Sequence, residues 1–299
     1  MRRAGSRLTL VAVCALGGML VAADPSAQDL PRVRPAPARP AGTASQGIAW
    51  LHEVDSASTR ARERGLPMMV EFRADWCGPC HMLEQRTFSD PRVVEAARRF
   101  VPVRVDFDAN PRLARRFQVD ALPAVLFTDA HGTEIARLNG YVGPAQFLKL
   151  MAQVPPDVRP FNELSARLVE NERDFEALLG MGLLFRKHAM VGTSTWYLQQ
   201  AAHAGKAAKP APLKFEEALY FLGENHLQER QWTAAIAAFT TLLERFPASE
   251  RAPVVHLELG KAYAASGDRE RARGHLAPLA SRGERDPVAR QAREILESL

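Results

Sequence analysis

The stretch Trp76-Cys77-Gly78-Pro79-Cys80 determines how the rest of this 299-residue chain is interpreted. The short apolar run 68–72 precedes it, and the helix-forming residues 81–86 follow it. This order places both cysteines on a turn from a strand into a helix. Cys77 would begin the helix, where free backbone N–H groups and the helix dipole stabilise a thiolate. Cys80 would lie one turn further along, and the intervening proline suits a first helical turn.

These two cysteines are better suited to redox chemistry than to stabilising the fold. The chain has three cysteines, and the third, Cys14, lies in an apolar leader. A disulfide between residues this close together closes too small a loop to stabilise a fold much. We therefore interpret Cys77 as the nucleophile and Cys80 as the resolving thiol, which attacks a mixed disulfide on Cys77.

The motif resembles the active site of the thioredoxin family, and the resemblance extends over about residues 47 to 153. Further matches follow in the order of that family: an acid before the cysteines, a basic residue in the next strand, a turn into a short helix, a cis-proline loop and a closing glycine. In this sequence they are Glu71, Arg104, Asp108–Pro111, Leu122-Pro123 and Gly140. Thr87–Pro91, with Trp50 in an upstream helix, is similar to a periplasmic subgroup that includes the C-terminal domain of the bacterial transmembrane thiol-disulfide interchange protein.

The resemblance implies how protons are handled at this site. Glu71 would accept the proton of Cys80, because a carboxylate between apolar neighbours should have a pKa raised by burial. The family has Asp at this position, so the longer Glu side chain changes its reach. Arg104 would pair with Glu71 and lower that pKa again.

The resemblance also implies a substrate-binding surface. Leu122 and Pro123 would hold the substrate backbone, with Pro123 in the cis form. Beside the cysteines, the shallow platform would consist of Trp76, Gly78 and Pro79. The charge of His81, on the surface of the helix, would tune the reactivity of the nucleophilic cysteine.

A second pattern overlaps the first, because Cys77–His81 also satisfies Cys-x-x-Cys-His, the attachment motif of c-type haem. The preceding strand, Trp76, the following helix and Leu122-Pro123 fit the thioredoxin pattern instead. Structural zinc needs further ligands at suitable spacing, and the chain has no second cysteine pair. We therefore expect no haem, no metal and no other cofactor, only a redox-active disulfide between Cys77 and Cys80.

Strands that alternate with helices and end in a hairpin predict an α/β domain with a mixed central sheet flanked by helices. Strands are expected at Met68–Arg73, Val101–Phe107, Ala124–Thr128 and Glu134–Leu138. Helices are expected at Gly47–Arg64, Cys77–Arg86, Pro91–Arg99, Pro111–Phe117 and Pro144–Met151. Prolines 155, 156 and 160 mark a boundary, so this domain is assigned to residues 47–154.

A connector helix is expected in residues 155–174, followed by an all-helical domain in 175–299 that resembles about three tetratricopeptide repeats. The small and large residues of this repeat recur around Gly223 and Gly260, 37 positions apart, and more weakly around Gly182, 41 positions before Gly223. The ideal period is about 34 residues, so the turns should hold the extra residues. In the first copy Ser194 stands in place of the expected alanine. Three repeats are the number expected for a stable stack.

The N-terminus is typical of a secretory signal over residues 1–23. Three arginines precede the apolar run Leu8–Ala23, and small residues before Asp24 suit cleavage near Ala23. The alternative is an uncleaved signal that anchors the chain in the inner membrane, although the run is short for a spanning helix. Residues 24–46, rich in Pro and Ala, are expected to form an extended linker.

The net charge of +5 does not indicate nucleic-acid binding. Residues 1–46 hold six arginines and two aspartates, so the remainder carries only +1. Beyond residue 46 the basic residues are expected to form an ordinary solvated surface.

These observations favour an exported thiol-disulfide oxidoreductase, periplasmic or secreted, with a repeat domain for partner docking. Gly-Pro between the cysteines resembles reducing thioredoxins, which favours a reductase or isomerase that maintains cell redox homeostasis. Its partners would be protein thiols and disulfides, a membrane electron donor of the thiol-disulfide interchange type and an unknown protein or peptide at the repeats. The alternatives are a thiol oxidase, a non-catalytic repeat scaffold and, more remotely, a c-type haem protein.

Overall fold

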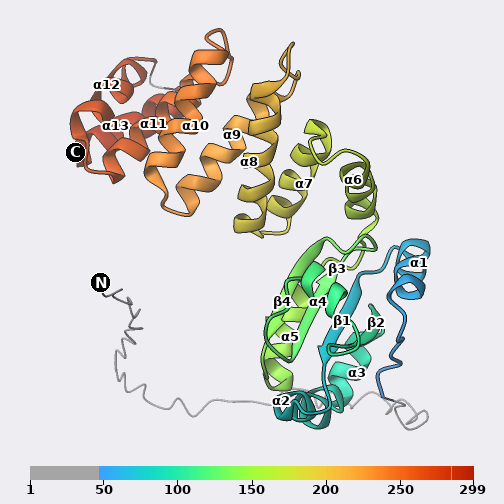
Figure 1. Cartoon of the computed structure of the whole chain (residues 1–299). Coiled ribbons are helices and arrows are strands. Elements are labelled where there is room, and N and C mark those ends of the chain that lie inside the picture. Colours follow the sequence, from blue (N-terminus) through green and yellow to red (C-terminus); the bar gives the residue numbers. More distant parts are fainter. Residues whose placement is uncertain (1–46, 284) are drawn as a thin grey trace, which may run out of the picture. The chain divides into compact units, whose positions relative to one another are not determined.

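A computed structural model describes residues 47–283 and 285–299 (Figure 1). The signal and the linker expected in residues 1–46 lie outside the described residues. The sheet has the order β2-β1-β3-β4 and comprises β1 (Met68–Arg73), β2 (Val101–Asp106), β3 (Ala124–Thr128) and β4 (Glu134–Asn139). Strand β1 runs parallel to β2 and antiparallel to β3, and β3 pairs antiparallel with β4. The predicted mixed α/β sheet is therefore confirmed.

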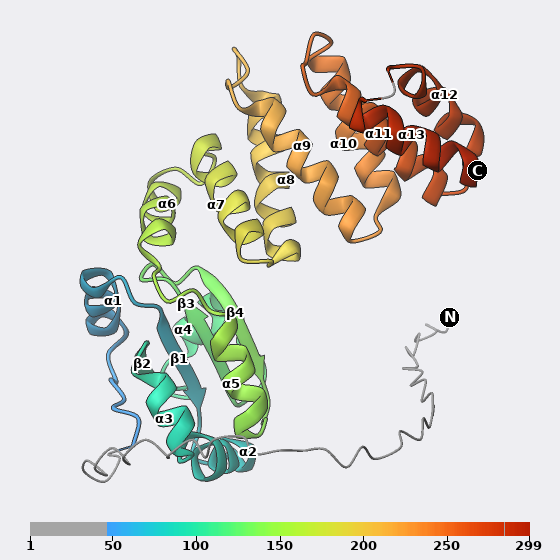
Figure 2. The ribbon, with the colours of Figure 1, turned by 180° about the vertical axis from the view of Figure 1, so that it is seen from behind.

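Helices cover both faces of this sheet (Figure 2). Helices α1 (Val54–Arg64) and α4 (Pro111–Arg116) pack on one face, and α3 (Pro91–Ala97) and α5 (Pro144–Gln153) pack on the other. Side chains alternate along a strand, so Val70 and Phe72 join the first core and Met69 joins the second. By the same alternation Glu71 lies on the side of Met69.

The cysteine motif begins an α-helix that continues directly into a π-helix. Helix α2 (Gly78–Met82) continues into the π-helical segment η1 (Leu83–Phe88), so the helix extends beyond the expected end at Arg86. Leu83 and Phe88 are buried against the core under α3 and α5. The wider turns of a π-helix shift the side chains that follow the cysteines relative to an ordinary α-helix, and such segments often occur at functional sites.

The expectation of a helix from Gly47 is wrong for residues 47–53. Leu51 instead forms a parallel bridge with Val103 on the outer edge of β2. Its N–H donates to the carbonyl of Pro102 at 3.0 Å, and its carbonyl accepts from the N–H of Arg104 at 2.8 Å. Pairing satisfies edge groups that an exposed strand would leave open. Trp50, also expected in a helix, therefore lies in this extended segment.

The connector helix α6 (Arg159–Glu170) packs on the loop between β3 and β4. Phe161 is fully buried, and Oδ1 of Asn162 accepts a 2.8 Å hydrogen bond from the N–H of Ala130. The hydroxyl of Ser165 donates to Asp129, a fully buried carboxylate whose pKa burial raises above its usual value. The loop thus receives polar partners that the sheet domain alone does not provide.

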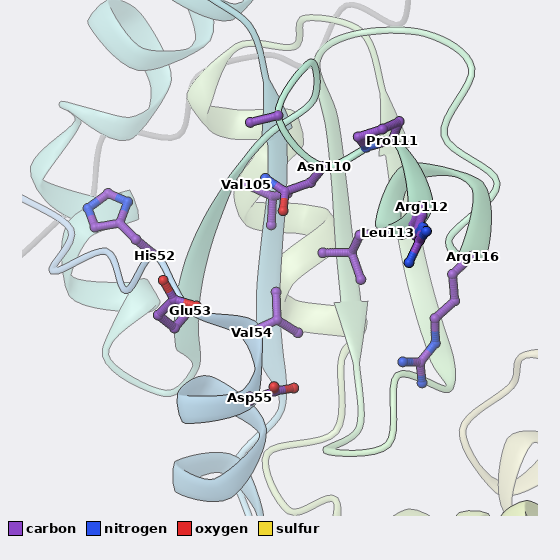
Figure 3. A pocket seen from close by; sticks show the side chains of 11 residues that line it. His52, Glu53, Val54, Asp55, Val105, Asn110, Pro111, Arg112, Leu113 and Arg116 are labelled. Atoms are coloured by element: carbon purple, nitrogen blue, oxygen red, sulfur yellow. The ribbon is translucent and has the colours of Figure 1, made fainter.

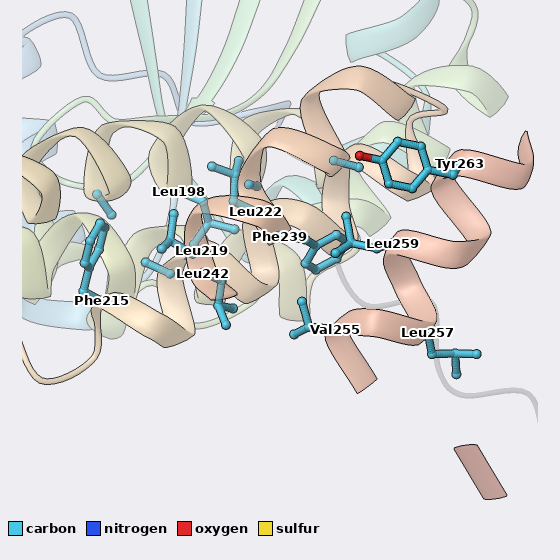
Figure 4. Packing of buried hydrophobic residues seen from close by; sticks show 14 of the residues in the cluster. Leu198, Phe215, Leu219, Leu222, Phe239, Leu242, Val255, Leu257, Leu259 and Tyr263 are labelled. Atoms are coloured by element: carbon cyan, nitrogen blue, oxygen red, sulfur yellow. The ribbon is translucent and has the colours of Figure 1, made fainter. Parts of the chain in front are cut away.

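The remaining described residues form seven helices: α7 (Phe175–Lys187), α8 (Val191–Ala207), α9 (Phe215–Gln228), α10 (Trp232–Arg245), α11 (Ala252–Ala265), α12 (Arg269–Ala280) and α13 (Pro287–Ser298). They pack in consecutive pairs around a continuous apolar core (Figure 4). None of the helices within residues 47–283 and 285–299 combines the length and apolarity needed to cross a membrane.

One relation recurs in the pairs α7–α8, α9–α10 and α11–α12. A Cβ added to Gly182, Gly223 or Gly260 would lie within 2.7 Å of a side chain sixteen positions later, namely Leu198, Phe239 and Leu276. Glycine therefore lets the two helices of each pair approach closely. The three predicted helical hairpins are all present.

The serine that departs from the repeat pattern has its own bonding. The hydroxyl of Ser194 donates to the carbonyl of Gly182 at 2.7 Å and accepts from Nδ2 of Asn225 at 2.8 Å. A buried hydroxyl needs such partners, whereas alanine needs none. Ser194 therefore bonds the first hairpin to the second.

Candidate redox site

Cys77 and Cys80 form a disulfide with their Cα atoms 5.3 Å apart. Cys77 caps helix α2, and its Sγ accepts a 3.2 Å hydrogen bond from the N–H of Cys80. Cys77 is 3% exposed and Cys80 is fully buried. After reduction, the same N–H and the helix dipole would stabilise negative charge on Cys77, so the more accessible sulfur is also the better nucleophile.

Glu71 is the buried acid on the same side of the sheet as the active-site helix. It is fully buried, and Nε of Arg104 donates to its Oε2 at 2.7 Å. Its other oxygen, Oε1, has no hydrogen-bond partner among the described residues. Burial raises the pKa of Glu71 above its usual value, and the nearby Arg104 guanidinium offsets part of that effect. The expected pairing with Arg104 is present.

Arg104 has a second acidic partner that the sequence analysis missed. Its Nη1 donates to Oε1 of Glu84 at 3.0 Å, and its guanidinium lies 4.7 Å from the centre of the Trp50 ring. Trp50 in turn packs against Phe88, with ring centres 5.2 Å apart. Glu84 lies in η1, four residues after Cys80, and no local sequence pattern indicated its contact with Arg104.

The loop before β3 adopts the expected form. The Leu122–Pro123 peptide bond is cis, and Leu122 packs against the cluster that contains Cys77 and Cys80. The N–H of Gly140 donates to the carbonyl of Pro123 at 2.7 Å. Gly140 has φ +85°, a backbone conformation that favours glycine. This glycine therefore ties the end of β4 to the proline loop.

The exposed residues beside the disulfide are also positioned by hydrogen bonds. Trp76 is 69% exposed, and its indole N–H donates to Oδ2 of Asp108 at 2.8 Å. Nε2 of His81 lies 2.8 Å from the carbonyl oxygen of Asp75. Gly78 has no heavy atom within 4 Å of an added Cβ. The aromatic surface next to Cys77 is thus open and held in one orientation by Asp108, which the sequence analysis did not assign.

A cavity of about 620 Å³ opens between the start of α1 and α4 (Figure 3). Its lining includes carboxylates of Glu53 and Asp55 and guanidinium groups of Arg112 and Arg116. Neither cysteine lines it, although Asn110 follows closely after Asp108 in the chain. The cavity is therefore separate from the disulfide.

Some predicted site residues contact the cysteines or the buried acid, and others bond to neighbouring loops instead. Leu122 contacts the cysteine cluster directly, and Arg104 contacts Glu71. Trp76 and His81 flank the disulfide in sequence, with hydrogen bonds that point to neighbouring loops. The thioredoxin-like domain thus holds a disulfide whose first sulfur caps α2, a fully buried second cysteine and, on β1, a buried carboxylate of raised pKa.

Two segments of the chain match known protein families. Residues 54–155 match the thioredoxin-like domain family, and residues 226–296 match the tetratricopeptide repeat family. The thiol:disulfide interchange protein DsbD of Salmonella choleraesuis (strain SC-B67) is 36% identical over 152 residues, which is 49% of this chain and 26% of that protein. DsbD of Yersinia pestis (strain Pestoides F) is 37% identical over 116 residues, 37% of this chain and 19% of that protein. The chain thus spans about a quarter or less of the length of these relatives.

Solved structures also give matches to part of the chain. The oxidised C-terminal domain of DsbD from Neisseria meningitidis is 23% identical, with a TM-score of 0.32 over 35% of this chain and 98% of that one. A structure described as DsbH oxidoreductase is 22% identical, with a TM-score of 0.32 over 42% of this chain and 90% of that one. Residues 54–155 are a thioredoxin-like domain, and a helical region with tetratricopeptide repeats follows it.

Proposed function

We propose that this chain is an exported thiol-disulfide oxidoreductase that works as a reductase or isomerase and uses its repeats to dock protein partners. The observation that carries the proposal is the position of Cys77, whose Sγ accepts the N–H of Cys80 at the start of α2. A sulfur in that position is stabilised as a thiolate once the disulfide is reduced.

The reaction would proceed by two exchanges. The Cys77 thiolate attacks one sulfur of a substrate disulfide, and the other substrate sulfur leaves as a thiolate that takes up a proton. Cys80 then loses its proton and attacks Sγ of Cys77, which releases the second substrate sulfur and forms the Cys77–Cys80 disulfide. Two electrons pass from the dithiol to the substrate, and a donor dithiol must return them.

Glu71 is proposed as the acceptor of the Cys80 proton. Its raised pKa brings it nearer to that of a thiol than an exposed carboxylate would be, which favours proton transfer. The free oxygen Oε1 offers a position for the proton while Oε2 remains bonded to Arg104. Leu122 and Pro123 would position the substrate backbone, with Trp76, Gly78 and Pro79 beside it.

The proposed partners are protein thiols and disulfides, a membrane electron donor of the thiol-disulfide interchange type and a protein or peptide at the repeats. Similarity to DsbD over 49% of this chain supports the first two. Export to the periplasm, by a signal that ends near Ala23 or remains as an anchor, is proposed on the same basis. The Cys77–Cys80 pair is proposed to need no haem or other cofactor. The visible spectrum of the denatured, purified protein should therefore lack the Soret band that covalently attached haem would give.

Reduction of insulin disulfides by the purified protein tests the proposal. Turnover that depends on Cys77 and on a dithiol donor is expected, whereas a scaffold would give none. Equilibration with glutathione then measures the reduction potential of the Cys77–Cys80 pair. A reductase has a lower potential than the glutathione couple, and an oxidase has a higher one.

A further inference from the structure

Two histidines meet in the last hairpin of the repeat region, on a part of the molecule that the redox chemistry does not use. His256 lies on α11 and His275 on α12, and their Nδ1 atoms are 2.9 Å apart. The ring centres are 5.2 Å apart, with an angle of 32° between the ring planes. Both residues are half-buried. Nineteen positions separate them in the sequence, so no metal-ligand spacing revealed the pair.

The surroundings hold these rings in place. The ring of Tyr263 stacks on His275 with an angle of 7° and a centre separation of 5.5 Å. The guanidinium of Arg271 covers Tyr263 at 4.8 Å. The helices that carry the two histidines pack tightly, since Gly260 lies against Leu276. Both imidazoles are thus held next to each other by their surroundings.

The pair is uncharged under neutral conditions. Burial lowers the pKa of His256, and burial together with the neighbouring ring lowers the pKa of His275. Two neutral imidazoles at this distance share one hydrogen, which one Nδ1 donates and the other accepts. A neutral imidazole nitrogen is the form that binds a metal ion.

The separation of the two nitrogens is close to that in a metal site. Metal–imidazole bonds are about 2.0–2.1 Å long, so two adjacent nitrogens lie roughly 2.9 Å apart on a tetragonal ion such as Cu²⁺ and roughly 3.3 Å apart on a tetrahedral ion. For an ion to bind beside the pair, both rings must turn so that each Nδ1 lone pair points at the ion instead of at the other nitrogen. The hydrogen that was shared moves to Nε2 of its own ring, and the exchange of tautomer releases no proton.

We propose that His256 and His275 form a two-imidazole site for a divalent transition-metal ion that favours nitrogen ligands. Cu²⁺ is expected to bind most tightly, as it does to nitrogen donors in general. Water would complete the coordination, because no group of three or more His, Cys, Asp or Glu is placed to hold a metal within residues 47–283 and 285–299. The site is independent of the cysteine pair.

Titration of the oxidised full-length protein with CuSO₄ tests this proposal, since the closed disulfide removes the thiols as competing ligands. Calorimetry should show a single tight site, and electron paramagnetic resonance should show coupling to two nitrogens. His256→Asn and His275→Asn should each weaken binding about tenfold or more. The asparagine amide can retain the hydrogen bond to the remaining histidine but offers no imidazole.

His203→Asn is the matched control, because His203 is an exposed histidine on helix α8. It should leave Cu²⁺ binding unchanged. Equal binding by all three variants, or a spectrum without two nitrogen couplings, would overturn the proposal. If a variant is unfolded without metal, nuclear magnetic resonance of the wild type tests the site instead. Added Cu²⁺ should broaden the ring resonances of His256 and His275 before those of His203. The reverse order would contradict the site.

Discussion

Nε of Arg104 donates a 2.7 Å hydrogen bond to Oε2 of Glu71, while Oε1 of the same carboxylate has no partner within the described part of the chain. Arg104 therefore holds one oxygen and leaves the other able to accept a proton. Because Arg104 also binds Glu84, it links the buried acid to a half-exposed acid on the active-site helix.

The two cysteines should behave differently when each is replaced. Cys80→Ser should accumulate mixed disulfides through Cys77, because the resolving thiol is lost. Cys77→Ser should trap no partner by this route, since the remaining sulfur is fully buried. Non-reducing gels of cell extracts compare the two variants. Similar patterns in both lanes would show that the roles are assigned wrongly.

Removal of Arg104 should cost much more stability than removal of a surface arginine. Arg104→Met leaves Glu71 buried without its cation and should lower the unfolding free energy at neutral pH by about 3 kcal/mol. The control Arg98→Met breaks a pair with Glu95 in which both side chains are about 70% exposed, so it should cost about 1 kcal/mol or less. Urea denaturation of the oxidised proteins measures both.

A double variant separates the ion pair from simple packing. Glu71→Gln combined with Arg104→Met removes the buried charge together with its partner. It should therefore recover most of the stability lost in Arg104→Met. If the two losses simply add, Arg104 stabilises the fold through its contact with Trp50 instead.

The raised pKa of Glu71 gives stability a definite pH dependence. Between the ordinary value of 4.5 and the higher value in the folded state, the folded protein keeps a proton that the unfolded chain has lost. The contribution of Glu71 to the unfolding free energy is therefore fully present below pH 4.5. It is lost as the pH rises through the pKa of Glu71 in the folded state. Glu71→Gln should lack this fall, so its unfolding free energy relative to the wild type should increase with pH. Glu95→Gln, at an exposed position, provides the baseline. A constant difference for Glu71→Gln would mean that folding leaves the pKa of Glu71 unchanged.

The turns within the hairpins offer a matched pair of backbone tests. Ala189 and Gly267 occupy equivalent positions, seven residues after Gly182 and Gly260, with φ of +59° and +88°. Ala189 is exposed, so Ala189→Gly should relieve left-handed strain and stabilise the fold by about 0.5–1 kcal/mol. Gly267→Ala, with no atom within 4 Å of the added Cβ, should destabilise it by about 1–2 kcal/mol. Thermal unfolding that shifts in the same direction for both would refute the interpretation.

Helix α6 should be needed for a stable thioredoxin-like fragment. The sequence predicted a domain complete at residue 154, but Phe161 is buried against that core and Ser165 donates to Asp129. A fragment of residues 47–171 should therefore be at least about 3 kcal/mol more stable than one of residues 47–155. Both fragments should reduce a small disulfide under conditions in which they are folded. Equal urea midpoints would show that α6 contributes nothing to the domain.

The sequence was informative wherever local pattern and backbone geometry agree. The strand before the cysteines follows from local pattern, whereas the cis bond before Pro123 and the spacing of Gly182, Gly223 and Gly260 were expected from resemblance to known families. The failures arose from contacts distant in sequence. Residues 47–53 have helical composition, yet Leu51 pairs with the edge of β2 because that edge is otherwise open.

The same limit applies to the site. The pairing of Arg104 with Glu71 follows from neighbouring parallel strands, in which the two residues are direct partners in register. Its second bond, to Glu84, depends on the π-helical turn of η1, which no local pattern predicts. The bond from Trp76 to Asp108 likewise joins two loops 32 positions apart.

The constant distance from each hairpin glycine to its large partner has a consequence for how this chain can change in length. Sixteen positions separate Gly182 from Leu198, Gly223 from Phe239 and Gly260 from Leu276, whereas successive glycines are 41 and 37 positions apart. The variation lies between the large residue of one hairpin and the glycine of the next. Most of it is in helix α8, which continues nine residues beyond Leu198, whereas α10 continues six beyond Phe239. An insertion between hairpins, such as one between α8 and α9, should therefore be tolerated, whereas a single residue gained between a glycine and its large partner would move the two apart. Reporter peptides or new loops would accordingly be placed in residues 208–214.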